Sequence, residues 1–236
     1  MKYMPKQNII FGGVSLSAYG AYAIYCNTLD TPKRSVDVVN VPGRNGALVF
    51  DNGRYDDVTR TYVVVSESYD GIRALLAALS AVTGYARLSD GYEPDMYMMA
   101  RLTDVTMPVI LQDGACRVTL SFVRKPQKYL AIGETLTQYA NGAKLANPTT
   151  YTALPLVKVT GTGTVTIGSE TITISTNATY TFIDCETQNA YKDGTNLNAN
   201  ISLTSGNFFS LAPGTTGVTF ANTITEVMIA PRWWTL

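Results

Sequence analysis

Residues 154–176 read LPLVKVTGTGTVTIGSETITIST, and the alternation in this stretch decides the fold class of the surrounding region. Apolar side chains take every second position, and threonines fill most positions between them. Such a period of two is typical of β-strands with one buried face. Gly168-Ser169 suits a two-residue type II′ turn, whose first central position requires glycine. A hairpin closed by this turn pairs Val165 with Ile172 on the apolar face.

The same register predicts a ladder of threonines on the other face, with Thr166 opposite Thr171 and Thr164 opposite Thr173. Further short strands are predicted along the chain, separated by the turn-rich stretches YKDGTN and LAPGTTG. They are TYTFID, ANISLT, GVTFA and EVMIAPRW. Many short antiparallel strands with regular turns indicate a β-sandwich.

The composition of the chain changes near residue 140. Residues 1–140 carry 27 of the 36 charged side chains, whereas residues 141–236 carry 9 of them but 21 of the 31 threonines. The stretch GETLTQYANGAKLANPTT between these regions mixes Gly, Asn, Pro and Thr without periodicity, as linkers do. We therefore expect two domains, residues 1–140 and residues 141–236.

The first domain combines strands with one predicted helix over residues 68–84. Strands are indicated by RTYVVVSE, MYMMARLTDV and CRVTLSFVR. Within the helix, apolar residues recur at i, i+3, i+4, i+7 and i+10 and form one stripe: Ile72, Leu75, Leu76, Leu79 and Val82. Ser68 or Asp70 can cap its start, and Gly84 suits the position after its end.

The predicted helix is poor in charge. Arg73 and Ser80 are its polar residues outside the first turn, and alanines fill much of the surface beside the apolar stripe: Ala74, Ala77, Ala78 and Ala81. A helix of this kind is usually covered on more than one side. We expect the cover to come from its own domain or from a neighbouring subunit.

The overall composition argues against catalysis. The chain has 18 basic and 18 acidic residues, a net charge of zero and no polybasic run that would attract nucleic acid or anionic lipid. It has no histidine, which removes Ser-His-Asp and Cys-His systems and histidine metal sites. Asp56 with Asp57, or Glu93 with Asp95, are conceivable carboxylate pairs, but each lies in a turn-like stretch where solvated surface acids are expected. We expect no enzyme activity, no cofactor and no metal.

Other features indicate the environment of the chain. Three cysteines lie far apart, which favours reduced core residues in a chain folded in a cytosol over a disulfide: Cys26, Cys116 and Cys185. The N-terminus MKYMPKQNIIFGG lacks the apolar run and cleavage site of a signal peptide, and no stretch approaches the about 18 apolar residues of a membrane span. GTGTVTIG is similar in composition to a glycine-rich phosphate-binding loop. Such a loop is followed by a helix, whereas a strand is predicted after this stretch, so we expect no nucleotide binding.

Residues 41–54, VPGRNGALVFDNGR, contain three turn signals. Pro-Gly at 42–43, Asn-Gly at 45–46 and Asn-Gly at 52–53 can each form a tight turn, because glycine accepts the positive φ that such turns need. The run ALVF between them is extended and apolar, and so short a hairpin supplies little core of its own. The segment is either a hairpin of the domain surface or a protruding arm that docks on another molecule.

The chain ends in IAPRWWTL. Val227 and Ile229 alternate as in a strand, and Pro231 should end the pairing of that strand or place it on a sheet edge. We expect one of Trp233 and Trp234 to be buried, because the pair would otherwise leave a large apolar patch in water.

Seven stretches of the chain follow one another in an order that matches a known family. In residues 1–140 they are VPGRNGALVFDNGRYDD, GYARLSDGYEPDMYMMARL and CRVTLSFVRKPQKYLAIGE. In residues 141–236 they are NPTTYTALPLVKVTGTGTVTIG, TYTFIDCETQNAYKDGTN, NFFSLAPGTTGVTF and IAPRWWTL. Together they resemble the distal tail proteins of siphophages over nearly the whole chain. Asp57 departs from the pattern, which has an amide there.

The resemblance implies a mainly β chain with an N-terminal, tail-tube-like β-sandwich flanked by an α-helix, and a C-terminal galectin-like β-sandwich. It implies a structural virion protein that forms a homo-hexameric ring at the distal end of a long non-contractile tail. The ring would join the tail tube to the baseplate or tip and leave a channel for DNA. Its partners would be the tail tube protein, a tail-associated tip protein and other baseplate proteins. The protein would be assembled in the bacterial host cytoplasm and reside at the tail tip of the virion.

In such a ring the adjacent subunit is the natural cover for the apolar segment at 41–54. We expect this segment to act as an assembly arm, with Arg44 and Arg54 paired with carboxylates of the neighbour. The expected interface residues are Pro42, Gly43, Arg44, Asn45, Gly46 and Arg54. The alternative is a solvated hairpin with two surface arginines.

Two other functions remain as alternatives. A galectin-like sandwich can bind host glycans through exposed aromatic rings, although packing is the commoner role of such residues. The candidate rings are Tyr180, Tyr191, Trp233 and Trp234. A tail-associated hydrolase is disfavoured by the absence of histidine and of a plausible acid–base pair.

Overall fold

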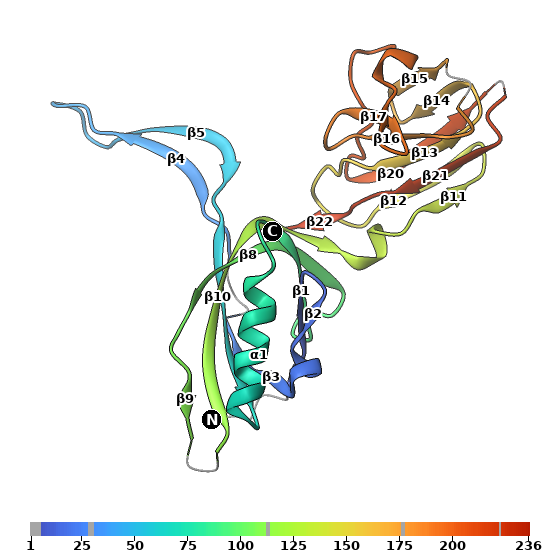
Figure 1. The fold of residues 1–236 in the computed structure, drawn as a ribbon. Coiled ribbons are helices and arrows are strands. Elements are labelled where there is room, and N and C mark those ends of the chain that lie inside the picture. Colours follow the sequence, from blue (N-terminus) through green and yellow to red (C-terminus); the bar gives the residue numbers. More distant parts are fainter. Residues whose placement is uncertain (1–5, 28–30, 112–113, 176–177, 222) are drawn as a thin grey trace. The chain divides into compact units, whose positions relative to one another are not determined.

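The computed structural model describes residues 6–27, 31–111, 114–175, 178–221 and 223–236 (Figure 1). The chain divides into two compact units, residues up to 128 together with Leu236, and residues 129–235. Both units consist mainly of antiparallel strands, which confirms the predicted mainly β fold. None of the helices formed by the described residues is long and apolar enough to cross a membrane.

The N-terminal unit consists of one large antiparallel sheet, a two-stranded ribbon and an α-helix. Its elements are β1 (Ile9–Phe11), β2 (Val14–Ser15), the 3₁₀ helix η1 (Leu16–Tyr19), β3 (Ala21–Cys26), β4 (Arg34–Val39), β5 (Leu48–Tyr55), β6 (Val58–Ser66), α1 (Tyr69–Ser80), β7 (Ala86–Asp90), β8 (Met96–Val105), β9 (Val109–Ile110) and β10 (Cys116–Leu130). The strand order of the large sheet is β2-β1-β7-β8-β10-β6-β3, and β9 pairs with the start of β10. The ribbon is β4 with β5.

The large sheet closes around one hydrophobic core. Gln7, just before β1, exchanges two backbone hydrogen bonds of 2.9 Å with Ala23 of β3, so the segment that leads into β1 pairs with the strand at the far end of the strand path. Helix α1 packs against this core through Ile72, Leu75 and Leu79, which are fully buried. The remaining members of the predicted apolar stripe are partly buried beside them.

The start of α1 agrees with the prediction, and its end does not. The Ser68 hydroxyl caps the helix by accepting the Gly71 N–H at 3.0 Å. The helix ends at Ser80, and its cap is Ala81 in right-handed helical conformation. Gly84, with a φ of 71°, lies further along and forms part of the bend that leads into β7. Its positive φ therefore serves that bend and does not stop the helix.

The C-terminal unit is a sandwich of two antiparallel sheets. Its elements are η2 (Ala131–Gly133), β11 (Thr137–Tyr139), β12 (Ala143–Asn147), β13 (Leu156–Thr160), β14 (Gly163–Ile167), β15 (Glu170–Ile174), β16 (Thr181–Asp184), β17 (Asn189–Lys192), β18 (Thr195–Asn196), η3 (Asn198–Asn200), β19 (Ile201–Leu203), β20 (Gly214–Phe220), β21 (Glu226–Ala230) and β22 (Trp234–Thr235). One sheet has the order β11-β21-β13-β16-β17-β18 and the other β12-β20-β14-β15-β19. Their inner faces share one core.

The division between the units lies at 128/129, ahead of the change in composition near residue 140. The reason is β11, which pairs with β21 and so belongs to the C-terminal sandwich. The change in charged residues along the chain therefore does not mark the boundary between the units, because strand pairing decides which core a segment joins.

The hairpin of β14 and β15 has the predicted register. Val165 lies opposite Ile172, and both are fully buried. Thr166 lies opposite Thr171, with a hydrogen bond of 2.9 Å between the two hydroxyls. Gly168 has the positive φ, 63°, that the turn requires. The three cysteines of the chain are buried and none of them is part of a disulfide, as predicted for core thiols.

Candidate assembly surface

The ribbon of β4 and β5 extends away from the large sheet of the N-terminal unit (Figure 1). Its tip is the loop between the two strands, residues 40–47. There the Arg44 N–H donates to the Val41 carbonyl at 3.2 Å, and Gly43 has a φ of 80°. These features form the tight turn predicted at the Pro-Gly pair, with glycine at the position that needs positive φ.

Both faces of the ribbon are apolar near the tip. Opposed residues of an antiparallel pair share a face, so Val38 and Val49 lie on one face, and Phe50 lies on the other with Val39. The exposed fractions are 57% for Val38, 62% for Val49 and 56% for Phe50. A lone two-stranded hairpin is marginal in water, and clustered exposed apolar groups mark interaction surfaces. The ribbon is therefore a candidate interaction surface.

Asn52 and Gly53 do not form the chain reversal that the sequence predicted. They lie inside β5, where residues 52–54 face one residue of β4 between two paired positions. The φ of 68° at Gly53 therefore serves a β-bulge. Asn52-Gly53 forms a bulge rather than a turn because β4 stays paired with β5 on both sides of it.

A polar brace holds the ribbon near its root. Arg34 Nε lies 2.6 Å from Asp51 Oδ2, and Arg34 Nη1 donates to the Tyr55 hydroxyl at 3.2 Å. Asp51 also accepts the Gly53 N–H at 2.9 Å. This backbone bond first, and Arg34 second, lower the pKa of Asp51 below its ordinary value. The bulge and the ion pair thus stabilise each other.

The six predicted interface residues are exposed, but they do not form one site. Five of them occupy the tip loop: Pro42, Gly43, Arg44, Asn45 and Gly46. Arg54 lies in the bulge of β5, so the two arginines are at opposite ends of the ribbon. Among the described residues, neither of their guanidinium groups has an ion-pair partner.

A cluster of buried charges lies just beyond the root of the ribbon, and the sequence did not indicate it. Arg60 of β6 is fully buried, and its Nη2 lies 2.9 Å from Asp90 Oδ2 and 2.8 Å from Glu93 Oε2. Its Nε donates at 3.0 Å to the hydroxyl of Tyr62, which itself donates to Asp90. Lys128 Nζ lies 2.8 Å from Glu93 Oε1. Arg60 and Lys128 are thus paired with two carboxylates, which offsets the cost of removing these charges from water.

The carboxylate pairs nominated from the sequence do not match this arrangement. Glu93 is not a solvated surface acid, because its side chain is only 22% exposed and pairs with two cations. Asp95, Asp56 and Asp57 are exposed, and Asp57 accepts a hydrogen bond of 2.6 Å from the Tyr85 hydroxyl. Neither nominated pair thus forms an acid–base couple in a cleft.

The outer face of helix α1 is also uncovered. Ala74, Ala77 and Ala81 are exposed, on the side of the helix away from the core. The cover expected from the sequence for this face is either the helix's own domain or a neighbouring subunit. No described residue of the chain covers it. A neighbouring subunit remains the predicted cover.

The two tryptophans at the C-terminus differ in burial, as predicted. Trp233 is 4% exposed and belongs to the core of the sandwich. Trp234 stacks on Tyr151 with ring centroids 4.4 Å apart and donates to the Thr152 carbonyl at 3.0 Å. Strand β21 ends at Ala230, just before the proline.

The tyrosines nominated for glycan binding lie in a row of aromatic rings. Phe182 lies between Tyr180 and Tyr191, with centroids 5.6 Å from each. The ammonium groups of Lys158 and Lys192 lie 5.2 and 5.0 Å from the centroid of the Tyr180 ring. These rings therefore already pack against groups of the chain itself.

Comparison with known proteins reveals a shared fold. No protein-family model matches the sequence, and no curated protein matches it. Among solved structures, the Dit protein (gp 19.1) of phage SPP1 is similar with a TM-score of 0.69 and 14% identity, over 98% of this chain and 99% of that chain. SPP1 Dit is described as a paradigm of the hub adsorption apparatus in phages that infect Gram-positive bacteria. The resemblance to distal tail proteins is thus confirmed at the level of the fold.

Proposed function

We propose that this protein is a structural hub at the distal end of a phage tail. The observation that carries the proposal is the likeness of the whole chain, both units included, to a hub protein of a phage adsorption apparatus. A virion protein of this kind needs surfaces for assembly rather than a catalytic site. The exposed ribbon and the uncovered face of α1 are surfaces of that type.

In this proposal the N-terminal unit, predicted from the sequence to span residues 1–140 and bounded by the structure at residue 128, forms a closed homo-hexameric ring. The apolar tip of the ribbon in one subunit contacts the next subunit, and Arg44 and Arg54 pair with carboxylates there. Identical heterologous contacts produce a ring when their rotation closes. A neighbour that covers Val38, Val49 and Phe50 would remove exposed apolar surface, which is the main driving force of association.

The ring would connect the tail tube to the baseplate or tip and leave a channel through which DNA passes. Residues 141–236 would be the galectin-like part, and the partners of the protein would be the tail tube protein, a tail-associated tip protein and other baseplate proteins. Balanced charge suits this role, because the chain has 18 basic and 18 acidic residues and so no excess cation to hold DNA. The protein would be assembled in the host cytoplasm and reside in the virion.

The oligomeric state tests the proposal. The full chain should give a closed ring by native mass spectrometry and negative-stain imaging. Arg44→Glu with Arg54→Glu should yield a folded monomer with a near-normal melting curve. Both arginines are exposed in the single chain, whereas a reversed charge is costly once desolvated at every contact of a ring.

Two further variants sharpen the result. Lys144→Glu reverses an exposed charge on β12, outside residues 1–140, and should leave the ring intact. Val38→Lys with Val49→Lys places two charges on one face of the ribbon and should also abolish assembly. Intact rings from both double variants at ordinary ionic strength would show that the ribbon is not the assembly contact.

A further inference from the structure

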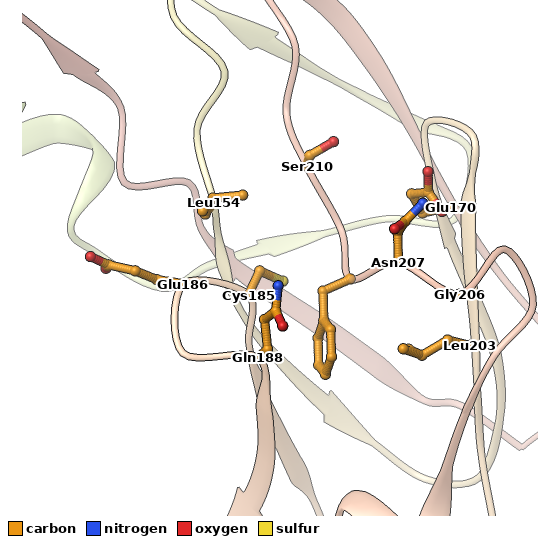
Figure 2. A pocket seen from close by; sticks show the side chains of 10 residues that line it. Leu154, Glu170, Cys185, Glu186, Gln188, Leu203, Gly206, Asn207 and Ser210 are labelled. Atoms are coloured by element: carbon orange, nitrogen blue, oxygen red, sulfur yellow. The ribbon is translucent and has the colours of Figure 1, made fainter. Parts of the chain in front are cut away.

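The C-terminal unit contains a cleft of about 470 Å³ that the proposed function does not use (Figure 2). One side is the turn after β16, residues 185–188. The other is the loop that leads from β19 toward β20, residues 206–210, with Glu170 of β15 next to it. In Figure 2 the Gln188 amide lies on one side of the cleft, and Asn207 lies beside Glu170 on the other. Segments distant in sequence thus bring polar groups around one hollow.

The turn on the first side is firmly held. Arg232 Nη1 lies 2.7 Å from Asp184 Oδ1 and 3.4 Å from Glu186 Oε2, and its Nη2 lies 3.2 Å from Asp184 Oδ2. Asp184 Oδ1 also accepts the N–H groups of Glu186 and Thr187, at 3.1 and 3.4 Å. Burial alone would raise the pKa of Asp184, but Arg232 and these N–H groups hold it below its ordinary value. A braced wall is a preorganised one, which reduces the entropic cost of binding.

Several polar groups of the cleft have hydrogen-bonding capacity to spare. Within the described part of the chain, the amides of Gln188 and Asn207 and the hydroxyl of Ser210 make no hydrogen bond. Each amide offers two donors and an acceptor, and the hydroxyl can act as either. The Ser205 hydroxyl donates a hydrogen bond to the Glu170 carboxylate, which keeps this carboxylate in place as an acceptor at the edge of the cleft.

The remaining lining is apolar or acidic. The half-buried ring of Phe208, together with Leu154 and Leu203, offers apolar surface to a ligand. Glu170 and Glu186 are the charged lining residues, and no lysine or arginine is among the residues that line the cleft. Phosphate, sulfate and other anionic ligands are therefore repelled. Mixed donors and acceptors beside an aromatic ring suit a ligand with many hydroxyls and an apolar ring face.

We propose that this cleft binds a neutral saccharide. The amides of Gln188 and Asn207 contact its hydroxyls from opposite sides, and Phe208 packs against a sugar ring. The site is distinct from the tyrosines and tryptophans nominated from the sequence, which pack against the chain itself. It does not depend on ring assembly, because every lining residue belongs to the C-terminal unit.

Saturation-transfer NMR on the full chain tests this proposal. The probes are maltose, lactose and chitobiose, each at about 5 mM to detect millimolar dissociation constants, with glycerol 3-phosphate as the anionic probe. At least one disaccharide should receive saturation, and glycerol 3-phosphate should receive none. Gln188→Ala with Asn207→Ala should weaken binding at least about tenfold, because both side chains are exposed and their loss removes ligand contacts rather than folding contacts.

Gln138→Ala is the matched control. It removes an exposed amide of β11 in the same unit, away from the cleft, and should leave binding unchanged. Ser210→Ala offers a second, smaller change in the cleft and should also weaken binding. The proposal is overturned if no disaccharide binds, if the Gln188/Asn207 double variant binds as well as the wild type, or if glycerol 3-phosphate binds as well as the sugars.

Discussion

Replacing Asp90 by asparagine tests whether burial, rather than distance, sets the strength of the ion pairs in this protein. Asp90 and Arg60 lie 2.9 Å apart with both side chains fully buried. Asp51 and Arg34 lie closer, at 2.6 Å, but their side chains are 47% and 49% exposed. Asp90→Asn and Asp51→Asn are therefore matched changes in two different environments.

Breaking one partner of a buried pair costs about 3–5 kcal/mol, because it leaves an uncompensated buried charge. The lower value applies to Asp90→Asn, since Arg60 keeps its contact with Glu93 at 2.8 Å. We expect a loss of about 3 kcal/mol, which is a large part of the 5–15 kcal/mol stability of a typical domain. Asp51→Asn should leave the stability of the N-terminal unit almost unchanged, because water solvates both groups of that pair.

Urea unfolding measures the difference. Both tryptophans of the chain lie in the C-terminal unit, so tryptophan fluorescence follows that unit, while far-UV circular dichroism follows both. With an m value of about 2 kcal/mol per M, Asp90→Asn should move the midpoint of the N-terminal unit by about 1.5 M to lower urea. The fluorescence midpoint should stay in place. An equal or larger effect of Asp51→Asn would refute the reasoning.

Three other predictions concern the C-terminal unit. Deleting residues 231–236 should cost several kcal/mol by removing buried Trp233, and an unchanged melting temperature would show that this tail is loose. Gly161→Ala should lower the urea midpoint markedly, since its Cβ would lie 2.2 Å from a backbone carbonyl oxygen; Gly194→Ala, with open space around it, should cost less. Burial raises the pKa of Cys185 from 9.0 to about 12, so the stability that the protonated thiol contributes should be complete below pH 9 and fall as pH rises toward 12. A midpoint constant from pH 8 to pH 11 would contradict that assignment.

The sequence by itself determined those features that depend on neighbours along the chain. The period of two and the Gly168-Ser169 turn were enough to predict the pairing of Val165 with Ile172, because a hairpin is a local structure. The apolar stripe and Ser68 likewise predicted α1 and its start. These signals are local in the chain, and no distant segment competes with them.

Only the tertiary structure decided how distant segments meet. Gly53 reads as a turn in isolation, but it is a bulge because β4 continues beside it. From the sequence alone, Glu93 is expected to be a surface acid. In the structure, the closed large sheet brings Glu93 between Arg60 and Lys128. Nothing in the sequence around these two residues indicates that contact. The cleft of the C-terminal unit arises in the same way, from a turn, a loop and a strand end. Local sequence patterns specify a secondary-structure element and its buried face. The packing of these elements decides which polar groups are removed from water, and such groups need hydrogen-bond or ion-pair partners in the folded chain.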